Sequence, residues 1–145
     1  MKTAAAVAAL AIVLVVSPSH AKDTHAPLPA SVIAAKTVYI DNQTGHSEIT
    51  DRAVDALTKW GRFKILNAAK DADLVLRFTA NTSGRPNPPH NDIDVSPTPI
   101  RFTVLDQTNN ELWSASKNEP LHSQTRLDIA EFKKRIEEQE KSHDK

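Results

Sequence analysis

Two amphipathic helices, each with a single apolar stripe, constrain the fold of this 145-residue chain most. The first follows a break at Gly45 and runs to about Trp60, where Gly61 predicts a left-handed C-terminal cap. The second runs from about Thr125 to Lys141, and Thr125 with Asp128 approximates a capping box at its start. The stripes are Ile49, Ala53, Ala56, Leu57 and Trp60 in the first helix, and Leu127, Ile129, Phe132 and Ile136 in the second.

Short segments before the first helix and between the two helices have the period-two alternation or the apolar composition of β-strands. They lie at 36–42, 63–66, 73–80, 100–106 and 111–116. The predicted order is therefore β-α-β-β-β-β-α, with a sheet of about five strands. Because two one-sided helices cover only one face of such a sheet, we expect an α+β protein with a two-layer α/β sandwich.

Alternation also divides the predicted strands between two faces. The residues expected to face the helices are Val38, Ile40, Leu74, Leu76, Phe78, Ile100, Phe102 and Val104. The residues expected on the uncovered face are Tyr39, Val75, Arg77, Arg101, Thr103 and Leu105. Aliphatic, aromatic and arginine side chains together are typical of protein contact surfaces, although antiparallel sheets also commonly have a solvated face. We predict an interaction module that binds a second copy of itself or an envelope protein.

The first 21 residues have the features of a cleavable signal peptide. Lys2 precedes an apolar stretch at 3–16, and Ser19 and Ala21 occupy the small positions of a cleavage site. The stretch is shorter than the ~20 residues of a membrane span, so we expect a periplasmic or secreted product without membrane insertion. The chain contains no cysteine, which excludes a lipoprotein signal and disulfides. The mature chain is predicted to comprise an extended arm at 22–35, one domain at 36–141 with a flexible loop at 81–99, and a frayed tail at 142–145.

Charge and motifs exclude several functions. Lysine plus arginine and aspartate plus glutamate number 18 each, and loss of Lys2 with the signal leaves 17 against 18, so no nucleic-acid partner is expected. The sequence has no G-x-S-x-G elbow and no phosphate-binding loop, and we expect neither an enzyme nor a cofactor. An alternative is a metal-dependent or hydrolytic enzyme, since His90, Asp92 and Asp94 lie close together in the loop.

Several short motifs resemble those of a family of small exported proteins of uncharacterised function from acidobacteria-like bacteria. They are Leu28-Pro29 with Val32, Ala35–Ile40, Lys59–Phe63, Ala72–Leu76 and Glu111–Ser114, in this order. At the level of topology the chain is also similar to envelope domains of the curli-secretion lipoprotein type and to the N-terminal domain of the Tol-system periplasmic protein. The resemblance implies an envelope location and an α/β sandwich, without implying an activity or catalytic residues.

Overall fold

The computed structural model describes residues 26–80, 99–117 and 121–143. The strands are β1 Thr37–Asn42, β2 Lys64–Leu66, β3 Leu74–Ala80, β4 Ile100–Leu105 and β5 Glu111–Lys117. The helices are α1 Ala30–Ala34, α2 Ser47–Trp60, the 3-10 turn η1 Ala69–Asp71, and α3 Leu121–His143. The strands form one mixed sheet in the order β2-β1-β3-β4-β5. β1 is parallel to β2 and β3, whereas β3–β4 and β4–β5 are antiparallel, and this arrangement confirms the predicted α+β class.

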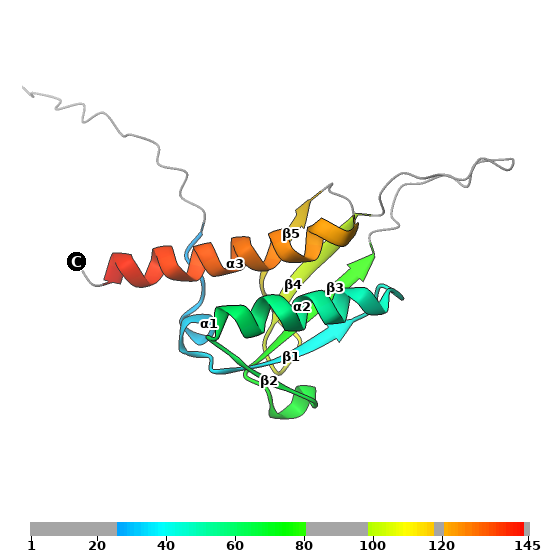
Figure 1. Ribbon diagram of the computed structural model, residues 1–145. Coiled ribbons are helices and arrows are strands. Elements are labelled where there is room, and N and C mark those ends of the chain that lie inside the picture. Colours follow the sequence, from blue (N-terminus) through cyan, green and yellow to red (C-terminus); the bar gives the residue numbers. More distant parts are fainter. Residues whose placement is uncertain (1–25, 81–98, 118–120, 144–145) are drawn as a thin grey trace, which may run out of the picture.

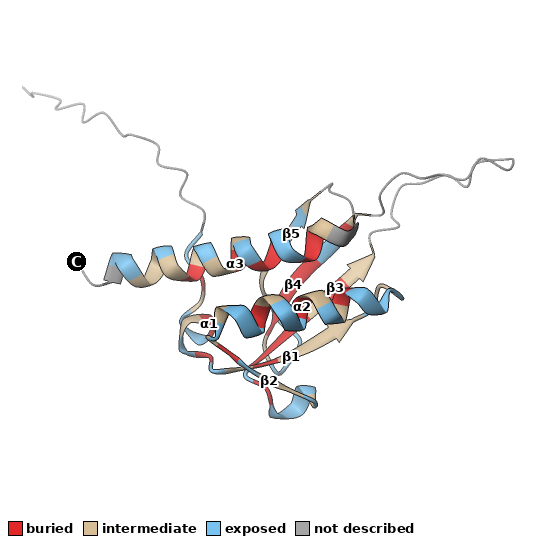
Figure 2. Cartoon of the chain, in the orientation of Figure 1, coloured by how far each residue is buried: buried red, intermediate tan, exposed pale blue. Residues whose placement is uncertain are grey.

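Helices α2 and α3 lie side by side on one face of the sheet (Figure 1). α2 covers β1, and α3 covers β4 and β5. The buried residues concentrate between these two layers (Figure 2). As the alternation predicted, this core contains Val38, Leu74, Leu76, Phe78, Ile100, Phe102 and Val104, together with Ile49, Leu57, Ile129 and Phe132 of the helices.

Aromatic rings fill the part of the core under α3. The Phe102 ring centroid is 4.9 Å from that of Phe78 and 6.0 Å from that of Phe132. Trp113 of β5 stacks on Phe132 at 5.4 Å. Because each fully buried ring contributes about 1.5–3 kcal/mol of hydrophobic free energy, this cluster anchors α3 on the β4–β5 hairpin.

The end of α2 agrees with the prediction, whereas the start of α3 does not. Gly61 adopts φ 71° and donates its amide to Leu57 O, as a left-handed cap requires. α3 begins at Leu121, so the capping box predicted from Thr125 and Asp128 is wrong, and both side chains are buried inside the helix. Leu127 was also assigned to the apolar stripe wrongly. It is 39% exposed, because it lies about 200° around the helix from Ile129 at ~100° per residue.

The predicted extended arm at 22–35 is partly helical and is packed against the domain. α1 occupies residues 30–34, and both Leu28 and Val32 are buried in the main core, so the prediction of an extended arm is wrong for this part. The predicted signal peptide at 1–21, residues 81–98 of the predicted loop and the tail residues 144 and 145 lie outside the described residues. The three predicted metal ligands in that loop, His90, Asp92 and Asp94, also lie outside them.

Candidate interaction surface

The register of the central strands brings the six predicted surface residues onto one face of the sheet. Tyr39 pairs with Val75, and Val75 pairs with Leu105. The next row pairs Arg77 with Thr103, and Arg101 follows on the same face of β4. Both long helices pack on the opposite face. We call the face formed by these six residues, together with Asp41, Glu111 and Ser114, the open face.

Burial divides the open face into a covered centre and an accessible periphery. Val75, Thr103 and Leu105 are only 5%, 7% and 4% exposed, although no helix packs on them. Tyr39 and Arg77 are half-buried, and Arg101 is exposed. The aliphatic contact area expected from the sequence is therefore not available. The accessible part of the open face is polar and aromatic.

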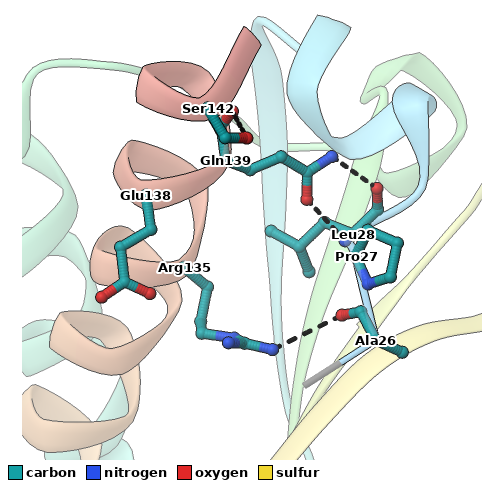
Figure 3. A pocket seen from close by; sticks show the side chains of 7 residues that line it. All are labelled: Ala26, Pro27, Leu28, Arg135, Glu138, Gln139 and Ser142. Atoms are coloured by element: carbon teal, nitrogen blue, oxygen red, sulfur yellow. Dashed lines mark hydrogen bonds between the residues drawn. The ribbon is translucent and has the colours of Figure 1, made fainter. Parts of the chain in front are cut away.

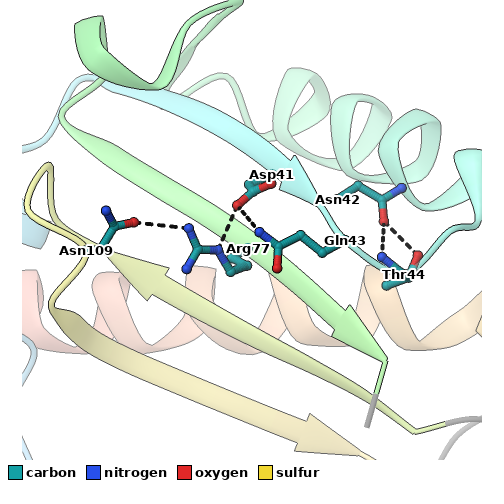
Figure 4. Close-up of polar contacts among 6 residues, drawn as sticks. All are labelled: Asp41, Asn42, Gln43, Thr44, Arg77 and Asn109. Atoms are coloured by element: carbon teal, nitrogen blue, oxygen red, sulfur yellow. Dashed lines mark hydrogen bonds and ion pairs between the residues drawn. The ribbon is translucent and has the colours of Figure 1, made fainter. Parts of the chain in front are cut away.

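Arg77 is held on the open face by a partner on each side. Its Nε donates to Asp41 Oδ2 at 2.7 Å, and its Nη2 donates to Asn109 Oδ1 at 3.0 Å (Figure 4). Asn109 lies in the turn that follows Leu105, so the Arg77 side chain extends from its own row past the Val75–Leu105 row. Gln43 Nε2 donates to the same Asp41 oxygen at 2.9 Å. These hydrogen bonds fix the position of the guanidinium on the open face.

A second polar cluster lies on the open face at β4 and β5. Arg101 Nη2 donates to the two carboxylate oxygens of Glu111 at 2.9 and 3.0 Å and to Ser114 Oγ at 3.2 Å. Ser114 Oγ donates to Glu111 Oε1 at 2.7 Å. The Ser114 hydrogen bond, followed by the hydrogen bond and charge of Arg101, lowers the pKa of Glu111, so this carboxylate is ionised at neutral pH. Arg77 is paired with Asp41, and Arg101 is paired with Glu111. The open face therefore carries positive and negative groups side by side.

Sequence reasoning missed a buried polar group on the helix side. Asp128 is 0% exposed, and neither of its carboxylate oxygens has a hydrogen-bond partner. Burial raises its pKa to about 7, against the opposing charge of Lys117. Gln124, one turn earlier, donates its side-chain amide to Ile100 O at 3.2 Å and to Lys117 O. The buried oxygens Gln124 Oε1 and Thr125 Oγ1 are also without partners. Hydrophobic periodicity carries no signal for such residues.

Three pockets lined by described residues lie away from the open face. One of about 200 Å³ marks the seam between α3 and residues 26–28 (Figure 3). At this seam Gln139 accepts a hydrogen bond from Leu28 N at 2.7 Å and donates one to Leu28 O at 2.9 Å. A second pocket, of about 210 Å³, lies between α2 and α3 around Trp60 and Ile129. A third lies beside α1, near Asp73 and Gln107.

The described part of the chain shows neither a metal-ligating cluster nor a membrane span. No group of three or more histidine, aspartate or glutamate side chains in 26–80, 99–117 and 121–143 is arranged to hold a metal ion. No helix within those ranges is long and apolar enough to cross a bilayer. The alternative enzyme site near 90–94 lies outside this part of the chain and stays a prediction.

Comparison with known proteins finds a distant structural neighbour. No family model matches the chain, and no curated protein matches it. The resemblance to small exported acidobacterial proteins therefore stays a prediction. Among solved structures, the chain is similar to a PelC dodecamer from Paraburkholderia phytofirmans, with 19% identity and a TM-score of 0.46. That alignment covers 77% of this chain and 92% of the PelC chain.

Proposed function

We propose that this chain is an exported protein whose folded part is an interaction module, and that it binds a partner protein through the open face. The observation that carries the proposal is the difference between the two sides of the sheet. One side is covered by α2 and α3, whereas the other presents two arginines held at fixed positions by Asp41, Asn109 and Glu111. Side chains already fixed in place lose little conformational entropy on binding.

A protein surface fits the open face better than a small molecule does. Small ligands need a concave site, and the three pockets described above lie elsewhere. Arginine and tyrosine are among the residues most enriched in protein contacts, and the open face offers Arg101 and Tyr39 beside paired charges. Because those charges alternate, the partner needs a complementary pattern of polar groups. The expected signal peptide supports a partner in the envelope or outside the cell.

Site-specific photo-crosslinking in the native envelope tests the location of this surface. The photo-reactive residue p-benzoylphenylalanine replaces Tyr39 in one variant and Arg101 in a second. A third variant has it at Lys59, which is exposed on α2 in the helix layer. We expect one protein to be linked to the Tyr39 and Arg101 positions and not to Lys59. Equal linkage at all three positions, or linkage at Lys59 alone, would contradict the proposal.

Direct binding of the identified partner tests the role of the charges. Arg101→Glu reverses one charge of the open face, and we expect at least a roughly tenfold weaker Kd, since such a reversal brings like charges together. Lys59→Glu is the matched control, because it makes the same charge change and also breaks an exposed ion pair, the 2.8 Å contact with Asp55. Leu105→Asp is unsuitable, since Leu105 is buried and the variant would place an unpaired charge there. Equal affinities of both charge variants would refute the proposal.

A further inference from the structure

The contact between α2 and α3 leaves a groove on the helix side of the sheet, away from the open face. Its volume is about 210 Å³, and we call it the helix groove. It is lined by Asp55, Ala56, Lys59 and Trp60 of α2 and by Arg126, Ile129, Ala130 and Lys133 of α3. Two of these residues, Ala56 and Ala130, have small side chains, and this leaves space between helices that pack closely elsewhere.

The floor of the helix groove is apolar. Ile129 and the two alanines line it, and Ile129 is only 3% exposed. Trp60 is the last residue of α2, and its ring lies edge-on to that of Phe132, with centroids 6.1 Å apart. The apolar floor therefore ends at an indole ring. Such a surface gains free energy when an apolar group covers it.

Two arginines lie at the opposite end of the helix groove. α2 and α3 run side by side in the same direction (Figure 1), and Trp60 contacts Phe132. At 1.5 Å of rise per residue, Arg126 lies about 9 Å before Phe132, and Arg52 lies about 12 Å before Trp60. The two arginines are therefore at nearly the same level. Arg52 is one turn before Ala56 and so is on the flank of α2 that borders the groove.

The unpaired positive charge of the helix groove is at this arginine end. Arg126 is exposed and Arg52 is half-buried, and neither forms a hydrogen bond or an ion pair with any of the described residues. The Nε atom of Arg52 is buried without a partner. The two lysines of the groove are paired within their own helices, Lys59 with Asp55 at 2.8 Å and Lys133 with Glu137 at 3.7 Å. An anion is therefore attracted to one end of an apolar channel.

We propose that the helix groove binds the anion of a single-chain fatty acid, with the carboxylate between Arg52 and Arg126 and the alkyl chain directed towards Trp60. Arginine matches a carboxylate with paired N–H donors, and the apolar floor favours an alkyl chain over a wholly polar anion. The volume equals that of about seven water molecules at ~30 Å³ each, which suits one short chain and is too small for the two chains of a membrane lipid. The stretch of about 9 Å from the arginines to the indole ring fits an extended chain of about eight carbons.

Calorimetric titration of the purified protein with octanoate tests the class of ligand. We expect saturable binding of octanoate, and roughly tenfold weaker binding of hexanoate, because hexanoate buries two fewer methylene groups. Octyltrimethylammonium has the same alkyl chain with a cationic head group and should not bind. Absence of saturable heat with octanoate would overturn the proposal. Equal affinity for the two octyl compounds would overturn it as well.

Substitutions in the helix groove test where octanoate binds. Arg126→Gln removes an unpaired cation and should weaken the Kd at least about tenfold. Lys70→Gln is the matched control, since Lys70 is an exposed cation of η1 that does not line the groove. Ala130→Leu should abolish binding, because leucine fills the groove. Ala130 is exposed and leucine is a good helix former, so thermal melting should show that the fold is kept. Unchanged affinity in either groove variant would contradict the proposal.

These experiments are independent of the proposed function. They need no partner protein, and the substituted residues lie on the helix side of the sheet, so either proposal can fail without the other. The apolar stretch at 3–16 is the same in every variant, and differences in octanoate affinity therefore report on the groove. Because the ligand is a small molecule, we still expect no protein to be linked at Lys59.

Discussion

Replacement of Asp128 by asparagine should stabilise the protein at neutral and alkaline pH. The carboxylate is fully buried between α3 and the sheet, and neither oxygen accepts a hydrogen bond. Burial penalises its charged form more than the nearby Lys117 favours it, and its pKa is raised from 3.8 to about 7. Asparagine has almost the same shape and no charge. The variant therefore removes the cost of ionising a buried group.

The expected magnitude follows from proton linkage. Below the unfolded pKa of 3.8 both folded and unfolded states hold the proton, and the free energy of unfolding is unaffected. Between that value and the folded value of about 7, only the folded state binds the proton, so stability falls as the pH rises. At about 1.4 kcal/mol for each pH unit, the loss approaches about 4 kcal/mol and is complete above the folded pKa. The Asp128→Asn variant should lack this loss.

Urea denaturation from about pH 4 to about pH 8, followed by tryptophan fluorescence, measures the effect. Trp113 stacks on Phe132 in the folded state and reports the loss of packing under α3. We expect the parent and Asp128→Asn curves to coincide at the acidic end and to separate steadily up to neutral pH. Asp55→Asn, an exposed position on α2, is the control and should follow the parent. A variant less stable than the parent at the alkaline end would refute the reasoning.

Three further changes test local contacts. Gln139→Ala removes both hydrogen bonds to the Leu28 backbone and should lower the free energy of unfolding by about 1–2 kcal/mol, measured with urea. Gly61→Ala should cost about 1 kcal/mol in the same assay, because φ is 71° there. Hydrogen bonds from the Asn110 side chain and backbone and from Thr108 lower the pKa of Asp106 from 3.8 to about 2. Asp106→Asn should therefore be less stable than the parent near neutral pH in thermal melts, and the difference should vanish as the pH falls through those two values.

The sequence predicted the strands and α2 well, because their signals are local. The alternation of Leu74, Leu76 and Phe78 with Val75 and Arg77 assigns each residue of β3 to a face, and the observed register agrees. Such a pattern identifies a face without revealing what covers it. Arg77, the next residue of this face along β3, bonds to Asn109, which is 32 positions away in the chain. Contacts of this kind follow only from the assembled fold.

The wrong predictions of an extended arm at α1 and of a start at Thr125 for α3 have a different cause. α3 begins at Leu121, ahead of the predicted start at Thr125, and its buried face there carries Gln124, Thr125 and Asp128 rather than apolar residues. Gln124 tolerates burial because its amide donates to carbonyl groups at the ends of β4 and β5. α1 has five residues, too few to be stable alone, and depends on contacts with the domain such as the Arg62 Nη2 bond to Ile33 O at 2.8 Å.

Two residues of the open face differ in what their substitution removes. Arg101 bonds to Glu111 and Ser114, so Arg101→Glu removes contacts between β4 and β5 as well as a positive charge of the face. Tyr39 is on β1, three strands from β5 and about 14 Å from the edge at ~4.8 Å per strand. Tyr39→Asp should therefore abolish partner binding and leave the Arg101–Glu111–Ser114 contacts intact.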